Sequence, residues 1–340
     1  MSHEFLQNVW YLLIGVLLTG YAILDGFDLG VGVLYPFIAK TDKERRTLLN
    51  AIGPFWDGNE VWLLTGGGAL FAAFPHVYAT VFSGFYLALM LVLFALIVRA
   101  VSFEFRSKVE SEQWRNAWDW AFFVTSLLPA LLTGVAVGNV IRGVPLDAQM
   151  EFTGNFFTLL NPFSLLVGLT GLAMFVTHGA VYVLLKTNGQ LAERARRLAI
   201  KWWTTWVVLA VLTSIVAAFD APARFAGKSP VVWLLPLLTL VFLALTRVNL
   251  NQDKHGPAFL FSALSIAGMM AVFGAGNYPY LLPARNVPEY GLTIFNASAS
   301  QNTLTAMLVI ALIGVPIVLV YTAYIYHVFR GKVQVEEGGY

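Results

Sequence analysis

The sequence contains no cysteine and little charge. Without cysteine the chain can form no disulfide, no c-type haem attachment, no cysteine-ligated zinc site and no cysteine-ligated iron–sulfur cluster. Charged residues make up 12% of the chain, half of the ~25% typical of soluble domains, whereas hydrophobic residues make up 58%. A soluble surface needs more charge than this, so the composition predicts an integral membrane protein.

The first eight residues also lack lysine and arginine, which a signal peptide carries at its start. No small-residue cleavage site follows the first apolar run, so we expect this run to remain as a transmembrane helix. The net charge of +2 gives no reason to expect a nucleic-acid partner, because the basic residues follow the membrane topology described below.

Nine apolar segments are long enough to cross a bilayer core of ~30 Å, which takes about 20 helical residues. The second and third are joined by little more than Phe74, Pro75 and His76, which predicts a tight hairpin. The sequence therefore predicts an all-α membrane protein with spans near residues 9–37, 54–74, 77–98, 117–141, 159–185, 202–219, 230–247, 257–276 and 304–329.

The basic residues predict the orientation, because cytoplasmic loops of membrane proteins carry an excess of lysine and arginine. With the N-terminus outside, seventeen basic residues fall on the cytoplasmic side and four on the other, so the N-terminus is expected to be periplasmic and the C-terminus cytoplasmic. The cytoplasmic set is Lys40, Lys43, Arg45, Arg46, Arg99, Arg106, Lys108, Arg115, Lys186, Arg194, Arg196, Arg197, Lys201, Arg247, Lys254, Arg330 and Lys332.

Ionisable residues inside the spans are the main functional signal, because each costs several kcal/mol unless it is paired or hydrated. Asp25 and Asp28 lie three residues apart in the first span and share a helix face. Gly26 and Gly30 form a G-x-x-x-G pair, which allows a second helix to approach closely. Two roles remain open for the aspartates: buried structural hydrogen-bond acceptors, or members of a functional cluster.

Two further acids open the second span. Asp57 lies near the helix N-terminus, where the helix dipole favours a carboxylate, and this alone can explain it. Glu60 lies one turn deeper on the same side, at membrane depth. Four carboxylates are thus predicted to cluster in the cytoplasmic half of the membrane, as in proton relays and in cation sites, and their spacing does not distinguish the two.

Histidine is scarce, and only His178 is expected deep inside a span. It could ligate a haem or relay protons, although a hydrogen-bonded packing residue is the commoner role. No two histidines have the helical spacing of a metal site. If haem chemistry is involved, most of the ligands must therefore come from another chain.

Several long sequence blocks resemble subunit II of the cytochrome bd-type quinol oxidases. The resemblance spans nearly the whole chain and is densest between residues 20 and 165. The blocks include D-G-F-D-L-G-V-G at 25–32, W-D-G-N-E-V-W at 56–62, G-G-A-L-F-A-A-F-P at 67–75 and T-G-N-F-F-T-L-L-N-P-F at 153–163.

This resemblance implies a bacterial inner-membrane complex that oxidises quinol, reduces oxygen to water with cytoplasmic protons and contributes to the proton-motive force. Haem b, haem d and the quinol site are expected on a larger subunit I, so no catalytic or metal-binding residue is expected on this chain. A small single-span accessory subunit belongs to some such complexes. The implied fold, over residues 1–340, is two four-helix bundles, about 9–141 and 159–276, plus a peripheral helix at about 304–329.

The resemblance also implies roles for single residues. The acids of a proton path from the cytoplasm fall on Asp25, Asp28 and Asp57, and Glu60 adds a fourth where some relatives carry glutamine. A tryptophan near an oxygen entrance falls on Trp62. Some members bind a structural ubiquinone, but the loop at about 220–229 is short here, so a clamp built on a longer loop is not expected.

Two other functions use the same features. An ion-coupled secondary transporter would use the same acids, but it predicts an inverted repeat with two broken helices, and the glycines at 66–68 have no counterpart in the second half. A purely structural subunit would assemble its partner and carry no transfer path. Substitutions of the acids distinguish this last function from a proton path.

Overall fold

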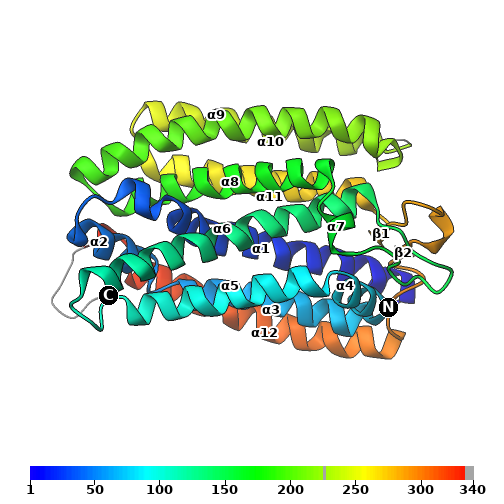
Figure 1. Cartoon of the computed structure of the whole chain (residues 1–340). Helices are drawn as coiled ribbons and strands as arrows, with labels where there is room; N and C mark the ends of the chain where they lie inside the picture. The colour runs from blue at the N-terminus through cyan, green and yellow to red at the C-terminus, as the bar shows by residue number, and fades with distance from the viewer. Residues whose placement is uncertain (225–226, 334–340) are drawn as a thin grey trace.

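The structure, a computed structural model, describes residues 1–224 and 227–333. Within these residues the long helices run side by side as an elongated bundle, and a two-stranded antiparallel sheet, β1 (Tyr280–Leu282) and β2 (Leu292–Thr293), lies at one end (Figure 1). The α-helices are α1 (His3–Ile38), α2 (Asp42–Ile52), α3 (Trp56–Ala73), α4 (Pro75–Gly84), α5 (Tyr86–Phe105), α6 (Glu112–Arg142), α7 (Phe156–Leu159), α8 (Pro162–Lys186), α9 (Gly189–Asp220), α10 (Leu234–Asn251), α11 (His255–Asn277) and α12 (Gln301–Val328). Short 3₁₀ turns cover Pro222–Arg224, Pro230–Trp233 and Pro288–Tyr290.

Eight helices of the described chain are long and apolar enough to cross a membrane: α1, α5, α6, α8, α9, α10, α11 and α12. They correspond to eight of the nine predicted spans. The ninth, α3, has 18 residues, and its first turns carry Asp57, Asn59 and Glu60, which lower its apolar character. The count of nine crossings and the orientation of the termini therefore stay predictions.

Polar residues begin the helices where local chemistry predicts them. The Ser2, Asn161 and Ser300 side chains each accept a hydrogen bond from a backbone N–H of the first turn that follows. Thr41 and Glu44 form a reciprocal capping box at the start of α2. These caps satisfy N–H groups that a helix cannot satisfy itself, and they fix where α1, α2, α8 and α12 begin.

Helices α1 and α8 are the most deeply buried. Every residue of α1 from Asp25 to Tyr35 is buried, and so are most residues of α8. Helix α8 approaches α6 closely at Gly134 and Gly168, and it meets α1 at Gly30 and Gly179. The two predicted four-helix bundles therefore share a packed interface, and the division of the chain into two bundles and a peripheral helix stays a prediction.

Two elements differ from the predicted spans. The segment predicted as one span at 77–98 is split at Phe85, whose backbone leaves the α-helical region, and Phe152 packs tightly against the neighbouring Gly84. Helix α9 begins at Gly189, thirteen residues before the predicted start at 202. Its first turns carry Arg194, Arg196, Arg197 and Lys201, so hydropathy did not reveal that the helix continues beyond the apolar part.

Helix α12 runs along α3 and α1 and ends at the same end of the bundle as α2 (Figure 1). Its middle is open to the surroundings, as at Ile310, Ile313 and Ile317, which are each more than 60% exposed. Its start is held where Trp10 Nε1 donates a hydrogen bond to the Leu304 carbonyl at 3.0 Å.

The short helix α2 is held by ion pairs in its first half and by buried apolar residues, Leu48, Leu49, Ala51 and Ile52, in its second half. Glu44 pairs with Arg194 of α9. Asp42 lies 2.8 Å from Arg106, whose guanidinium also pairs with buried Asp119 of α6 at 2.6 Å. These contacts tie α2 to α5, α6 and α9.

Candidate acid cluster

The predicted acids meet where α1, α3 and α5 pack together. Asp25 and Asp28 lie on α1, and both side chains have no exposed surface. Glu60 lies on α3 with 18% of its side chain exposed. The structure therefore brings three of the four predicted carboxylates to one site between helices.

Arg99 of α5 provides the positive charge of this site. Its Nη1 atom lies 3.1 Å from Asp25 Oδ1 and 2.6 Å from Glu60 Oε1, and the arginine itself is fully buried. The sequence analysis counted Arg99 only among the cytoplasmic topology charges and did not predict that it is buried and paired with two acids. The apolar residues that follow it, Val101 and Phe103, could have indicated that the span continues past Arg99.

Asn59 holds the third carboxylate. Its amide Nδ2 donates to Asp28 Oδ2 at 2.7 Å and to the Leu24 carbonyl of α1 at 3.1 Å. Its Oδ1 accepts a hydrogen bond from the Tyr326 hydroxyl of α12 at 3.1 Å. Asp28 is thus bound through a neutral amide, whereas Asp25 and Glu60 are bound by an arginine.

Some polar atoms in the cluster have no protein partner. Asp28 Oδ1 and Arg99 Nε and Nη2 are buried without a hydrogen bond from another group in the described residues. Buried polar atoms of this kind are as a rule satisfied by ordered water. The arrangement of acids and orphaned donors therefore suits a hydrated site.

Asp57 lies outside the buried part of the cluster. It is exposed in the first turn of α3, close enough to Glu60 for their charges to interact. From Asp57 inward, the next acid is Glu60 at the edge of the protein, and Arg99 and Asp25 follow in the interior. The four acids thus form a gradient from exposed to fully buried.

Trp62 follows Glu60 on α3 and packs against α1. The contact depends on Gly20, because a Cβ atom at that position would lie 2.2 Å from Trp62 Cε3. The tryptophan is partly exposed, so its ring borders the uncovered face of α3. The role of Trp62 near an oxygen entrance stays a prediction.

The two glycines beside the acids face α8. A Cβ atom on Gly30 would lie 1.9 Å from the Phe175 carbonyl oxygen, and one on Gly26 would lie 2.8 Å from the Phe175 ring. Gly179 of α8 lies directly opposite Gly30, and sequence reasoning did not identify it. The acids point between α3 and α5, while the glycines of the same helix segment contact α8.

His178 is fully buried with both ring nitrogens engaged. Nε2 lies 3.2 Å from the Ile23 carbonyl and Nδ1 lies 2.7 Å from the Ser262 hydroxyl. A carbonyl only accepts, so Nε2 carries the proton and Nδ1 accepts from Ser262. The ring also stacks on Phe259 with 4.6 Å between centroids. These contacts fit the hydrogen-bonded packing role.

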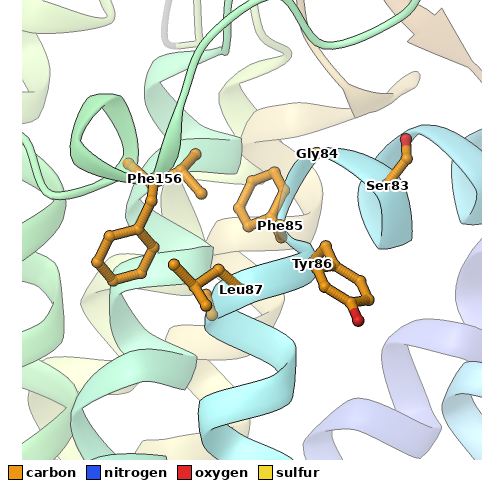
Figure 2. A pocket seen from close by; sticks show the side chains of 8 residues that line it. Ser83, Gly84, Phe85, Tyr86, Leu87 and Phe156 are labelled. Carbon is orange, nitrogen blue, oxygen red and sulfur yellow. The ribbon is translucent and has the colours of Figure 1, made fainter.

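His178 does not fit as a haem ligand. Neither nitrogen of the one fully buried histidine is free to ligate iron, and within the described chain no three His, Asp or Glu side chains are grouped as metal ligands. The α4–α5 junction borders a groove of about 270 Å³ that is lined mainly by apolar groups, including Phe85, Leu87 and Phe156 (Figure 2). This is below the ~300–1,000 Å³ usual for ligand sites, and we assign no ubiquinone to it.

The chain is similar to several known proteins of one kind. Residues 6–329 match the family described as cytochrome bd terminal oxidase subunit II. The chain is 41% identical to cytochrome bd-I ubiquinol oxidase subunit 2 of Escherichia coli over an alignment of 369 residues, which covers 99% of this chain and 97% of that protein. It is 36% identical to cytochrome bd ubiquinol oxidase subunit 2 of Bacillus subtilis, with 98% of each chain covered. The fold is similar to a chain of the bd oxidase structure from Geobacillus thermodenitrificans, with a TM-score of 0.80, 20% identity and coverage of 95% and 98%.

Proposed function

The chain belongs to the cytochrome bd terminal oxidase subunit II family, and from this we propose that it supports a haem-bearing subunit I and supplies a proton path from the cytoplasm to it. It is a multi-pass protein of the bacterial inner membrane and a component of a membrane quinol oxidoreductase complex. We place haem b, haem d and the quinol site on subunit I. The hydrogen bonds at both ring nitrogens of His178 support that placement.

The face formed by α3, α4 and α5 is the proposed contact surface for subunit I. Leu64 is 73% exposed, and Phe94 and Tyr86 are each more than 60% exposed. Asp57 and the edge of Glu60 open on this same side. A partner that covers this face would enclose the acids and receive protons from them.

The proton path rests on one observation: three carboxylates of graded burial, Glu60, Asp25 and Asp28, converge at membrane depth around Arg99 and Asn59. Protons enter at exposed Asp57, pass to Glu60 and reach the buried aspartates. Each group holds a proton in turn, and the orphaned atoms beside them suit connecting waters. Arg99 keeps Asp25 and Glu60 in place and partly balances their charge, and Asn59 holds Asp28.

An oxygen path beside Trp62 is a secondary proposal. The ring borders the uncovered face of α3 and rests on Gly20, a contact that any larger residue would alter. Oxygen dissolves well in the apolar membrane core, so an entrance on this face would receive it from the bilayer. The proposal predicts that Gly20→Leu raises the KM for oxygen while the response to pH stays the same.

Asparagine substitutions test the proton path, because asparagine keeps the size and polarity of aspartate but cannot carry the proton. Asp57→Asn and Asp28→Asn are expected to slow quinol-driven oxygen consumption at least tenfold in complexes with normal haem content. Glu110→Gln, an exposed acid of the α5–α6 loop, is the matched control. Wild-type turnover in both Asn variants would make the acids structural and place the path in subunit I.

A further inference from the structure

The last turns of α12 carry three tyrosines with different surroundings. Tyr321 and Tyr324 are 62% and 63% exposed. Tyr326 turns inward, and its ring lies on Phe55 with 4.4 Å between the ring centroids. One of the three tyrosines therefore reaches from α12 into the region where α3 begins.

The Tyr326 hydroxyl continues into the acid cluster. It donates to Asn59 Oδ1 at 3.1 Å, and the Nδ2 of the same amide donates to Asp28 Oδ2 at 2.7 Å. The carbonyl of Leu24 accepts from Nδ2 as well. In this orientation both ends of the Asn59 amide are satisfied, and α12, α3 and α1 are joined by one chain of hydrogen bonds.

The end of α12 that carries Tyr326 is fastened to α8 by two lysines in opposite directions. Lys186, in the last turn of α8, donates to the Phe329 carbonyl at the end of α12 at 2.6 Å. Lys332, just beyond α12, donates to the Leu184 and Thr187 carbonyls at the end of α8, both at 2.7 Å. A cation is favoured at a helix C-terminus, so each lysine caps the other helix.

We propose that Tyr326 is a positioning residue for Asp28 and that the two lysine caps hold it in place. This proposal rests on the proposed proton path and adds α12 to it. Asn59 would otherwise be free to rotate when Asp28 gains a proton, because a protonated carboxyl group can donate to an amide oxygen. The Tyr326 hydroxyl donates to that oxygen, and the Leu24 carbonyl, which can only accept, takes a hydrogen from Nδ2, so together they keep Nδ2 on Asp28 in both protonation states.

Replacing Tyr326 with phenylalanine tests this role, because it would leave a buried oxygen atom without a hydrogen-bond donor. Phenylalanine keeps the ring contact with Phe55 but leaves Asn59 Oδ1 without its donor, and a buried acceptor without a partner favours rearrangement. The amide would then leave Asp28 for part of the time. The change therefore acts on proton transfer and leaves the fold of α12 intact.

The test uses the assembled complex with verified haem content. Tyr326→Phe is expected to lower quinol-driven oxygen consumption about fivefold, the rate change that corresponds to one hydrogen bond of average strength. The KM for quinol stays unchanged, and the dependence of turnover on pH changes. Tyr324→Phe, on the exposed side of the same helix, is the matched control and keeps wild-type turnover and pH dependence.

A double-mutant cycle separates positioning from general destabilisation. If Tyr326 acts through Asn59, Tyr326→Phe has no further effect on turnover once Asn59→Ala is present. Lys332→Met is expected to lower turnover by a smaller factor. Lys201→Met changes an exposed lysine of α9 and is expected to leave turnover unchanged. If Tyr326→Phe and Asn59→Ala instead lower turnover independently, so that the double variant shows the product of the two single losses, the proposal is wrong.

The Asp28→Asn variant distinguishes a failure of this inference from a failure of the proton path. If Asp28→Asn slows turnover and Tyr326→Phe does not, the positioning role is wrong and the path stands. If Asp28→Asn has wild-type turnover, Asp28 is not part of the path, and a slow Tyr326→Phe variant would then show that Tyr326 does not act through Asp28. Slow turnover in both, with the expected non-additivity, supports the inference.

Discussion

Arg99 Nη1 lies 3.1 Å from Asp25 Oδ1, and neither side chain is exposed. The two residues come from different helices, α5 and α1, and are 74 positions apart in the sequence. A buried pair of this kind gains little over apolar residues of similar size, but the loss of one partner leaves the other charge uncompensated in a medium of low dielectric constant. The pair therefore makes the position of α5 depend on the acid cluster.

This predicts a large effect of Arg99→Met. Asp25 and Glu60 would lose their shared positive partner, and such losses cost about 3–5 kcal/mol. The yield of assembled complex and its thermal midpoint in detergent should both fall. Arg197→Met, an exposed arginine of α9, is the control and should leave both unchanged. An Arg99→Met complex with wild-type yield and midpoint would contradict the structural importance of the pair.

The sequence predicted the helical membrane fold because apolar length and charge asymmetry are local properties. It also placed Asp25, Asp28 and Glu60 near one another. Acids inside membrane spans are rare, so each one stands out in the sequence, and all three fall in the same half of the membrane. It did not predict their partners. Arg99 lies near the end of an apolar run, where an arginine usually marks the membrane surface, and only the packing of α5 against α1 shows that it is buried.

Asn59 and Tyr326 are two further residues of the cluster that the sequence did not predict. Neither is charged, and asparagine and tyrosine are common near helix ends, so nothing local marks them. Their link joins positions 267 residues apart and exists only because α12 returns to the start of α3. Gly179 was missed for the same reason, since its small size matters only where α1 crosses α8.

The contact between α1 and α8 predicts that Gly30→Leu blocks assembly. The new side chain would overlap the Phe175 carbonyl, a backbone atom that cannot move aside without displacing α8. Overpacking of a core by side-chain atoms alone costs about 1–3 kcal/mol, and a clash with backbone exceeds that range. Gly15→Leu is a control on the same helix, because a Cβ atom there meets nothing within 4 Å. Blue native electrophoresis measures the assembled fraction, and equal fractions for the two variants would exclude a packing role for Gly30.

The link between α2 and α9 predicts a pH-dependent contribution to stability. Burial acts to raise the pKa of Glu44, but hydrogen bonds from the Lys40 backbone and the Arg194 guanidinium outweigh it, so this pKa lies below its ordinary value. A carboxylate with a lowered native pKa stabilises the fold above its unfolded pKa, and the contribution disappears as pH falls through the native pKa.

Glu44→Gln should therefore lower the thermal midpoint at pH 7 by about 2 °C, which corresponds to less than 1 kcal/mol for a partly exposed pair. The difference from the wild-type protein should shrink below about pH 4.3, the ordinary glutamate pKa, and vanish at lower pH. Glu193→Gln, an exposed acid beside Arg194 on α9, is the control. A difference that stays constant as the pH falls from 7 to well below the ordinary glutamate pKa would mean that the charge of Glu44 contributes nothing.

The geometry of His178 predicts that this residue ligates no haem. Its two nitrogens bind the Ile23 carbonyl and the Ser262 hydroxyl, and an iron ligand would have to give up one of these bonds. His178→Phe keeps an aromatic ring against Phe259 but leaves the buried Ser262 hydroxyl without its partner, which costs about 1–3 kcal/mol. The variant should assemble in lower yield, while each assembled complex keeps the full haem absorbance of the wild type. Chain expressed without subunit I should show no haem band. A haem band that is lost from an otherwise assembled His178→Phe complex would make His178 an axial ligand, and it would also place a redox centre on this chain.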